Sequence, residues 1–341
     1  MNTIWFLILA AMVAIYAVLD GFDLGVGALL LFLTKTDDER QEALGIIGPL
    51  WNGNEVWLIA AGGAMVAAFP SLYAAAFSGF YLPLMIVLWL FVGRGIGYEF
   101  RHFEKSELWR GAADVVFSIA SLLLALLFGV ALGNVLRGVP MDARGNFTGA
   151  FAFLLNPFAL IAGLLSVVVL CQHGASYLAM RGGPDLRRRA LRLIGGLAFG
   201  STLLSVAIVA GSFVVRPDFL TNFQRWPVLV ILPLVGVGAI VNTFVQLRKG
   251  DGAGLFYSST ALIVALLGSA VAGLYPNLLR ALYGTHGLNL TIYNSAAAPH
   301  SLFTALCANV IGMSIVTVYM IYIYRTVHRS PAAPAPAAGG N

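Results

Sequence analysis

Two acidic residues, Asp20 and Asp23, interrupt YAVLDGFDLGVGALLLF, an otherwise apolar stretch at residues 16 to 32. Their spacing of three residues places both carboxyl groups on one face of a helix. A charged group near the centre of a bilayer costs a few kcal/mol, about 3 on insertion scales, so acids there commonly serve ions, protons or ligands. The alternative is a structural pair that hydrogen-bonds to helix ends or to hydroxyl groups of neighbouring helices.

Three further polar residues, Asn52, Asn54 and Glu55, lie at the start of the apolar segment PLWNGNEVWLIAAGGAMVAAFP. Glu55, Asp23 and Asp20 would form a ladder of titratable groups that leads from the inner side toward the membrane centre. Protons pass between buried carboxylates and intervening waters, so this pattern indicates proton uptake. In the alternative interpretation, Glu55 and the asparagines are caps and anchors at the headgroup boundary.

A mixed segment, GRGIGYEFRHFEKSELWRGAAD, closes the third apolar stretch. We expect Arg94 to extend its side chain to the membrane surface or to pair with Glu99, and Arg101 to belong to a solvated loop. The glycines at the start of this segment do not follow a strand, so they do not indicate a dinucleotide site.

The histidines and cysteines do not indicate a bound metal. His173 and His300 lie near opposite ends of their apolar segments, so they cannot together supply a bis-histidine haem site, although a single histidine with Met or an acid could still ligate iron. Cys171 and Cys307 both fall within apolar segments and have no metal-ligand spacing to a partner, which indicates packing residues.

The composition is that of a polytopic membrane protein. Of 341 residues, 59% are hydrophobic and only 10% are charged, and long apolar runs of this kind are absent from soluble domains. The net charge of +5 arises from Lys and Arg in short clusters between apolar runs. These clusters indicate membrane topology and not a nucleic-acid-binding face.

The sequence predicts an all-α fold with nine transmembrane helices, because nine segments reach the roughly 20 apolar residues that a span requires. The segments are 4–33, 50–69, 77–97, 114–136, 156–180, 191–214, 227–247, 256–276 and 299–325. When each Lys and Arg is assigned to its nearest connection, one side collects 15 and the other 5. The positive-inside rule then places the N-terminus outside and the C-terminus in the cytoplasm.

The chain divides into a transmembrane domain at residues 1–328 and a tail at residues 329–341. The tail contains SPAAPAPAAGGN, which is rich in Pro and Ala and has nothing able to bury a core. We therefore expect a disordered cytoplasmic end.

The ordered series of motifs resembles subunit II of the cytochrome bd-type quinol oxidases. The resemblance extends from residue 20 to about 302 through DGFDLGVGALLLF, WNGNEVWLIAAGGAMVAAFPSLYAAAFSGFYLP, RGIGYEFR, GVALGNVLRGVP, LLNPFALIAGLLSV, HGASYLAMR and LTIYNSAAAPHSL. It implies two four-helix bundles plus one additional helix. It also implies a bacterial inner-membrane complex in which haem b and haem d (or b) belong to partner subunit I, and in which quinol is oxidised and O2 is reduced to water.

The resemblance associates Asp20 and Asp23 with a proton route toward the haems of subunit I. Relatives often have Asp at the position of Asn52, which cannot ionise, and we expect Glu55 to supply the missing carboxylate one helical turn away. The resemblance also suggests that Trp57 lines an apolar route for oxygen or contributes to subunit packing. The resemblance also admits a small single-helix third subunit and a structural quinone or phospholipid in a groove of this chain.

Two rival functions remain compatible with the residues. Intramembrane acids beside glycine-interrupted helices also describe a proton-coupled secondary transporter, which would be active without a partner. In a purely structural assembly subunit, the acids would only bind subunit I and the protons would travel elsewhere.

Overall fold

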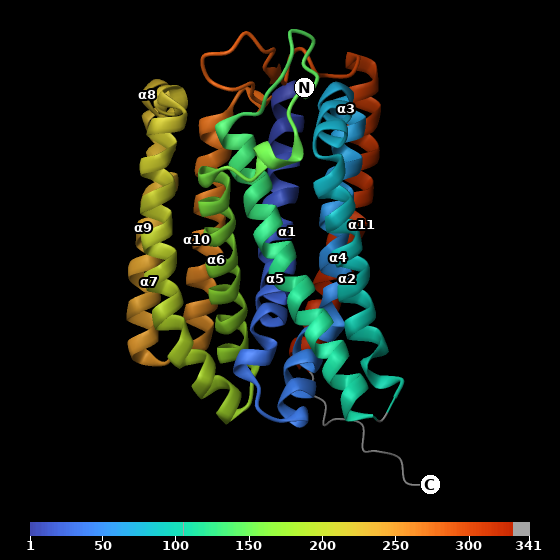
Figure 1. Ribbon diagram of the computed structural model, residues 1–341, viewed down its shortest axis with the longest axis vertical. Coiled ribbons are helices and arrows are strands. Elements are labelled where there is room, and N and C mark those ends of the chain that lie inside the picture. Colours follow the sequence, from blue (N-terminus) through green and yellow to red (C-terminus); the bar gives the residue numbers. More distant parts are fainter. Residues whose placement is uncertain (105, 330–341) are drawn as a thin grey trace.

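The computed structural model describes residues 1–104 and 106–329, the side chains of residues 327–329 excepted. The chain forms a bundle of long helices, and the start of the first helix and the end of the last described helix lie at opposite ends of this bundle (Figure 1). Apart from Arg329, which closes the last helix, the expected tail at residues 329–341 lies outside the described residues.

Nine helices of the described chain run the length of the bundle. They are α1 (Asn2–Leu33), α2 (Asp37–Ala68), α4 (Tyr81–Glu99), α5 (Glu107–Arg137), α6 (Pro157–Arg181), α7 (Pro184–Val215), α9 (Ile231–Lys249), α10 (Gly252–Leu274) and α11 (Pro299–Arg329). The two shorter α-helices are α3 (Pro70–Gly79) and α8 (Thr221–Arg225). Four 3₁₀ turns occupy Phe100–His102, Phe151–Leu154, Pro217–Leu220 and Pro227–Val230. The antiparallel strands β1 (Asn277–Leu279) and β2 (Leu290–Thr291) form a small ribbon in the loop before α11.

The predicted all-α membrane fold is confirmed. Within the described residues, eight helices are long and apolar enough to cross a membrane, and all nine predicted spans fall on the nine long helices. The helix that is not among the eight is α2, whose apolar part carries Asn52, Asn54 and Glu55. These three polar residues lower its hydropathy, and two of them build the site described below.

Local sequence signals explain where the helices begin and end. Thr36 and Glu39 form a reciprocal capping box at the start of α2. Asn156 and Asp251 accept backbone N–H groups at the starts of α6 and α10. Gly250 ends α9 in the left-handed conformation, with φ of 66°, which glycine adopts without steric cost.

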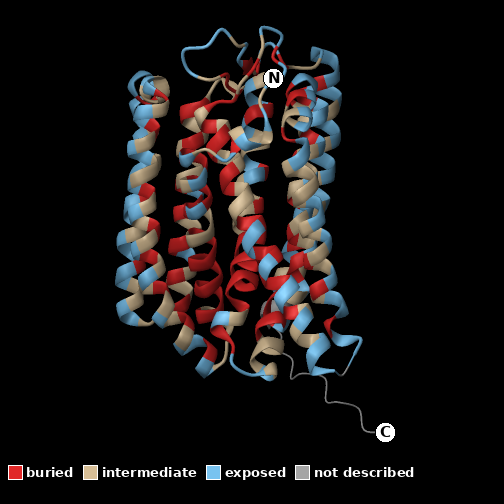
Figure 2. Cartoon of the chain, viewed as in Figure 1, coloured by how far each residue is buried: buried red, intermediate tan, exposed pale blue. Residues whose placement is uncertain are grey.

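The helices group as the resemblance implied. The first bundle contains α1, α2, α4 and α5, the second contains α6, α7, α9 and α10, and α11 packs mainly on α2. The inner half of α1 lies where the bundles meet, against α2, α5, α6 and α10, and its residues 20 to 30 are all buried (Figure 2). The acids of the first motif therefore lie in the protein interior and not against lipid.

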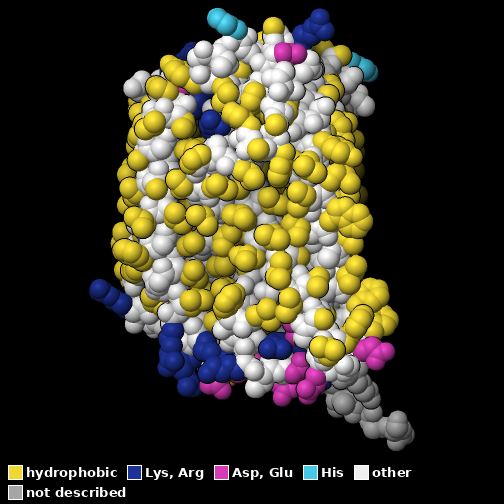
Figure 3. Space-filling model, in the orientation of Figure 1, with side chains coloured by type: hydrophobic (Ala, Val, Ile, Leu, Met, Phe, Trp, Pro, Cys, Tyr) yellow, Lys and Arg dark blue, Asp and Glu magenta, His cyan; other side chains and the backbone are white. Residues whose placement is uncertain are grey.

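The outer surface carries a wide apolar belt (Figure 3). Lys and Arg side chains gather below the belt, at the end of the bundle where the chain terminates. The gathering of Lys and Arg at one end agrees with the unequal numbers of basic residues that the sequence assigns to the loops on the two sides.

The crossing of α1 and α6 depends on two glycines. A Cβ atom at Gly25 would overlap the carbonyl oxygen of Leu170, and one at Gly174 would overlap the backbone nitrogen of Val26. Close backbone approach through small residues is how membrane helices pack without large side chains.

We predict that Gly25→Ala lowers the free energy of unfolding by about 1–3 kcal/mol, because the added methyl group overpacks a rigid contact. The yield of folded protein should fall as well. Gly196→Ala on α7 is the matched control, since a Cβ atom there meets nothing within 4 Å. Thermal unfolding in detergent measures both variants. Equal stability of the two variants would contradict the close-contact argument.

Candidate functional site

The centre of the candidate site is a buried ion pair between α1 and α4. The guanidinium of Arg94 donates to both carboxylate oxygens of Asp20, from Nη2 to Oδ1 at 2.9 Å and from Nη1 to Oδ2 at 3.3 Å. Both side chains are 0% exposed. A bidentate contact of this kind is strong and geometrically specific, so it fixes α4 against α1.

Glu55 brings α2 into the same cluster. Its Oε1 accepts from Arg94 Nη1 at 2.8 Å, and its side chain is 23% exposed. The Arg94 guanidinium also lies over the Trp51 ring, 5.7 Å from the centroid, a distance at which cation–π attraction acts. One arginine thus joins three helices, and Glu55 is the acid of this cluster that reaches the surface of the chain.

Asp23 has different surroundings from Asp20. Its Oδ2 accepts a hydrogen bond from Asn54 Nδ2 at 2.7 Å, whereas its Oδ1 is buried without a partner among the described residues. Asn54 Nδ2 also donates to the Leu19 carbonyl at 2.9 Å, and Asn54 Oδ1 accepts from the Tyr324 hydroxyl at 3.0 Å. Asp23 is therefore connected through an amide to α2 and α11 and not to the arginine.

The expectation for Arg94 is wrong, because its side chain neither reaches the membrane surface nor pairs with Glu99. A signal for the true arrangement was present in the sequence. Arg94 is the one Lys or Arg within the first three apolar segments, where Asp20, Asp23 and Glu55 also lie. Since buried charges are almost always paired, the lone cation was the natural partner of these acids.

Asn52 and Trp57 lie apart from the ion cluster. Asn52 is exposed on the outer face of α2. It lies fifteen residues after Asp37, roughly 22 Å along the helix from the start of α2. Trp57 is buried among apolar side chains that include Trp5 and Leu72, and its indole nitrogen has no partner.

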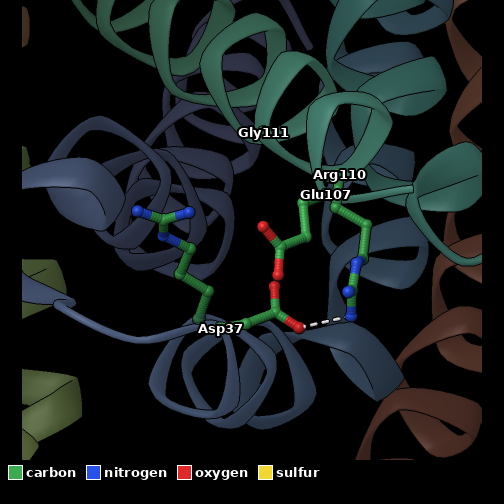
Figure 4. Close-up of a pocket in the computed structure, with 5 residues that line it drawn as sticks. Asp37, Glu107, Arg110 and Gly111 are labelled. Carbon is green, nitrogen blue, oxygen red and sulfur yellow. Dashed lines mark hydrogen bonds and ion pairs between the residues drawn. The ribbon is translucent and has the colours of Figure 1, made fainter. Parts of the chain in front are cut away.

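A second ion network lies at the basic end of the bundle, where α1 ends and α2 begins. Arg101 is 1% exposed and donates to Asp114 at 2.7 Å and to Asp37, so its predicted place in a solvated loop is wrong. Arg110 donates to the other oxygen of Asp37 at 2.6 Å. Figure 4 shows the Asp37 and Glu107 carboxylates pointing toward each other in an adjoining cavity of about 320 Å³. This network joins α2 to α5 below the buried cluster.

Titratable groups outside the spans are shifted by local contacts. The hydrogen bond from Arg189 and that from the backbone of Lys35 lower the pKa of Glu39. At the opposite end of the bundle, burial and then the nearby Arg216 charge lower the pKa of Arg280 to about 10. Arg280 donates to the last carbonyls of α10, so it stabilises the end of that helix.

The described histidines differ in their surroundings. Both ring nitrogens of the buried His173 are occupied, Nδ1 with the Ser259 hydroxyl at 2.7 Å and Nε2 with the Val18 carbonyl at 3.0 Å. His300 is exposed. Among the described residues, His, Cys, Asp and Glu form no group of three suited to a metal ion.

Comparison with known proteins gives a consistent result. The sequence profile of the family "Cytochrome bd terminal oxidase subunit II" matches residues 1–327. The chain is 33% identical to cytochrome bd-I ubiquinol oxidase subunit 2 of Escherichia coli (strain K12), with 94% of this chain and 92% of that protein covered. It is 30% identical to cytochrome bd ubiquinol oxidase subunit 2 of Bacillus subtilis (strain 168), with 97% and 98% covered.

A solved structure has the same fold. The bd oxidase from Geobacillus thermodenitrificans contains a chain that matches with a TM-score of 0.76 at 18% identity, covering 95% of this chain and 98% of that chain.

We predict that Arg94→Leu destabilises the protein by about 3–5 kcal/mol, because it leaves the Asp20 charge buried without a partner. The double variant Asp20→Leu/Arg94→Leu should recover much of this loss, since both charges are then absent. Thermal unfolding and the yield of purified protein measure the two effects. A double variant no more stable than Arg94→Leu would contradict the assigned pairing.

Proposed function

Because this chain belongs to the subunit II family of cytochrome bd terminal oxidases, we propose that it is the haem-free subunit that supports subunit I and supplies a cytoplasmic proton-uptake route. The complex of which it is part is a quinol oxidase. In the proposal, quinol is oxidised and O2 is reduced to water at subunit I. The protons consumed there enter through the acids of α1 and α2.

The observation that carries the proposal is the buried cluster of Asp20, Asp23 and Glu55 around a single Arg94. Three acids and one cation in an apolar interior exceed what packing requires, and such groups commonly mark proton pathways. Glu55 is 23% exposed whereas Asp20 is fully buried. This gradient of exposure suits a route from the outside of the chain inward.

Glu55 takes the role that a carboxylate at position 52 has in relatives. Asn52 has no ionisable group, while Glu55 lies one helical turn further along α2 and touches Arg94 directly. We place Asn52 beside the route, as a polar group that orders water, and Glu55 within it.

The proposed orientation puts the N-terminus outside and the end of α11 in the cytoplasm of a bacterium. The basic end of the bundle carries Arg101 and Arg110, and positive charge favours the cytoplasmic side. In this orientation Asp23 is nearer to the cytoplasm than Asp20.

The haems are assigned to subunit I. This assignment is supported by the described histidine side chains, since the buried His173 already uses both ring nitrogens and the other three, His102, His286 and His300, are exposed at the ends of the bundle, away from the buried acids. An axial histidine needs one free nitrogen directed at the iron. Haem b and haem d, or a further haem b, would accordingly lie across the interface.

We propose that subunit I covers the face of α2 that bears Asn52 and Glu55. Asn52 is exposed on α2 beside the partly exposed Glu55, and lipid would not satisfy its amide group. Covering this face would also bring Glu55 next to subunit I, so that the proton path could continue from Glu55 toward the haems. Trp57, which is buried on α2 among apolar side chains, stabilises this helix and borders any apolar route for O2.

An apolar groove of about 530 Å³ suits a structural quinone. It runs between α1, α2, α4, α5 and α10, and its lining is apolar except for Asn277. Ligand pockets commonly measure 300–1,000 Å³, with apolar walls and few polar groups. Extraction of the purified complex into organic solvent, followed by chromatography, would detect the quinone.

Glu55→Gln should slow quinol-driven oxygen reduction by ~10-fold or more, the low end for loss of a group that transfers protons. Turnover is measured per haem in the purified complex, so assembly and rate are separated. Glu99→Gln is the matched control, because Glu99 is exposed near the end of α4 and touches none of the buried acids. Unchanged turnover in Glu55→Gln would refute the assigned role, and equal losses in both variants would show a nonspecific charge effect.

A photo-cross-linker attached to Asn52→Cys should join this chain to the haem-bearing subunit, because that face of α2 is proposed to be covered. The background carries Cys307→Ser, which removes the exposed native thiol, while Cys171 is buried. Phe199→Cys on α7, where the side chain is 67% exposed, is the control for a lipid-facing position. Cross-linking from position 199 but not from position 52 would contradict the proposed interface on α2.

A further inference from the structure

The buried acids have unequal access to positive charge. Arg94 provides one charge, and its terminal nitrogens contact only Asp20 and Glu55. Asp23 takes part in no ion pair of the described residues. Full ionisation of the three acids would leave two uncompensated negative charges in the apolar interior, which is very costly.

Geometry decides which acid is compensated. Both oxygens of Asp20 face the guanidinium, so its charge is fixed in a bidentate pair. Glu55 is partly exposed and shares the same cation. Asp23 is 0% exposed, and its sole direct hydrogen-bond donor is a neutral amide.

The orientation of that amide is determined by its other partners. The Leu19 carbonyl can only accept, so the nitrogen of Asn54 must face Leu19 and Asp23, and the oxygen must face the Tyr324 hydroxyl. The amide N–H therefore donates to Oδ2 of Asp23. In a protonated carboxyl group the accepting oxygen is the carbonyl oxygen, which leaves Oδ1 to carry the proton.

We propose that Asp23 is the acid that stores a proton in the resting protein, on Oδ1, that Asn54 is the positioning residue that occupies Oδ2 and so determines which oxygen carries the proton, and that Asp20 is the permanent counter-ion of Arg94. The inference deepens the proposed proton route and rests on it for its functional meaning. It divides the two acids of the first motif between two tasks, where the spacing of the motif treats them as equivalent.

The other groups around Asp23 are consistent with this division. They are the acids Asp20 and Glu55, the cation Arg94, and the hydroxyl groups of Tyr98, Tyr177 and Tyr324. Two of the charges are negative and one is positive, so the surroundings disfavour a further negative charge. The Tyr177 hydroxyl, like Oδ1 of Asp23, is buried without a direct partner. Such groups are usually satisfied by water, which would give the stored proton an exit.

Infrared absorption of the purified complex tests the assignment. A protonated carboxyl group has a carbonyl stretch that is separate from carboxylate bands and moves to lower frequency in D2O. Subtraction of the Asp23→Asn spectrum from the wild-type spectrum should reveal this band, and subtraction of the Asp20→Asn spectrum should not. A band lost with Asp20 and kept without Asp23 would overturn the proposal, as would the absence of the band in both subtractions.

Asn54→Ala provides a second test, because it keeps the acid and removes its amide donor. The carbonyl band should move to higher frequency when the hydrogen bond to Oδ2 is lost. Asn242→Ala is the matched control, since Asn242 donates to Ser258 between α9 and α10 and does not touch Asp23. If Asp23→Asn fails to assemble, Asp23→Glu should move the band without abolishing it. An unchanged band in both Asn54→Ala and Asp23→Glu would contradict the assignment.

Turnover of the same variants separates this inference from the proposed function. Loss of the band together with slow oxygen reduction in Asp23→Asn supports both. Loss of the band with normal turnover per haem supports proton storage at Asp23 and overturns the route through it. Slow turnover with an unchanged band supports the route and overturns proton storage at Asp23.

Discussion

The structure depends on the pairing of one buried cation with acids from two other helices. Arg94 on α4 binds Asp20 on α1 and Glu55 on α2, so the first bundle closes around a charge that lipid could not tolerate. The cost of moving three ionisable groups out of water is recovered only if all three helices adopt one relative position. The cluster that suits proton transfer is thus also what specifies the packing of the helices around it, and the second bundle then packs on the inner half of α1 through the glycine contact at Gly25.

Much of the architecture was readable from the sequence. The nine apolar segments, the charge asymmetry and the interior position of Asp20 and Asp23 follow from the length of a bilayer span and from the cost of charge in lipid. The spacing of the two acids correctly placed both in the interior. It did not reveal that the two acids have different partners. Residues three positions apart on a helix point in slightly different directions, so Asp20 meets Arg94 of α4 and Asp23 meets Asn54 of α2.

Partners across helices were the part that sequence reasoning could not supply. Arg94 lies near a predicted membrane surface and has Glu99 close in sequence, so a local contact was the simpler expectation. Arg101 lies in a polar run typical of a loop, yet Asp37 and Asp114 enclose it. In both cases the true partner is distant in the chain, and only the three-dimensional arrangement of the helices shows which acid each arginine meets.

The hydrogen bond from Tyr324 to Asn54 has a consequence for the order in which the protein forms. Tyr324 follows Asn54 by 270 residues, and α11 packs mainly on α2. During synthesis α1 and α2 leave the ribosome long before α11, so the amide that holds Asp23 lacks its last donor until that late helix docks. The Trp5 indole, which donates to the Leu302 carbonyl at 3.1 Å, ties the other end of α11 to the start of the chain. The two contacts make the buried cluster depend on complete insertion: a nascent chain arrested before α11 would have an Asn54 amide without its Tyr324 donor, together with an uncovered face of α2.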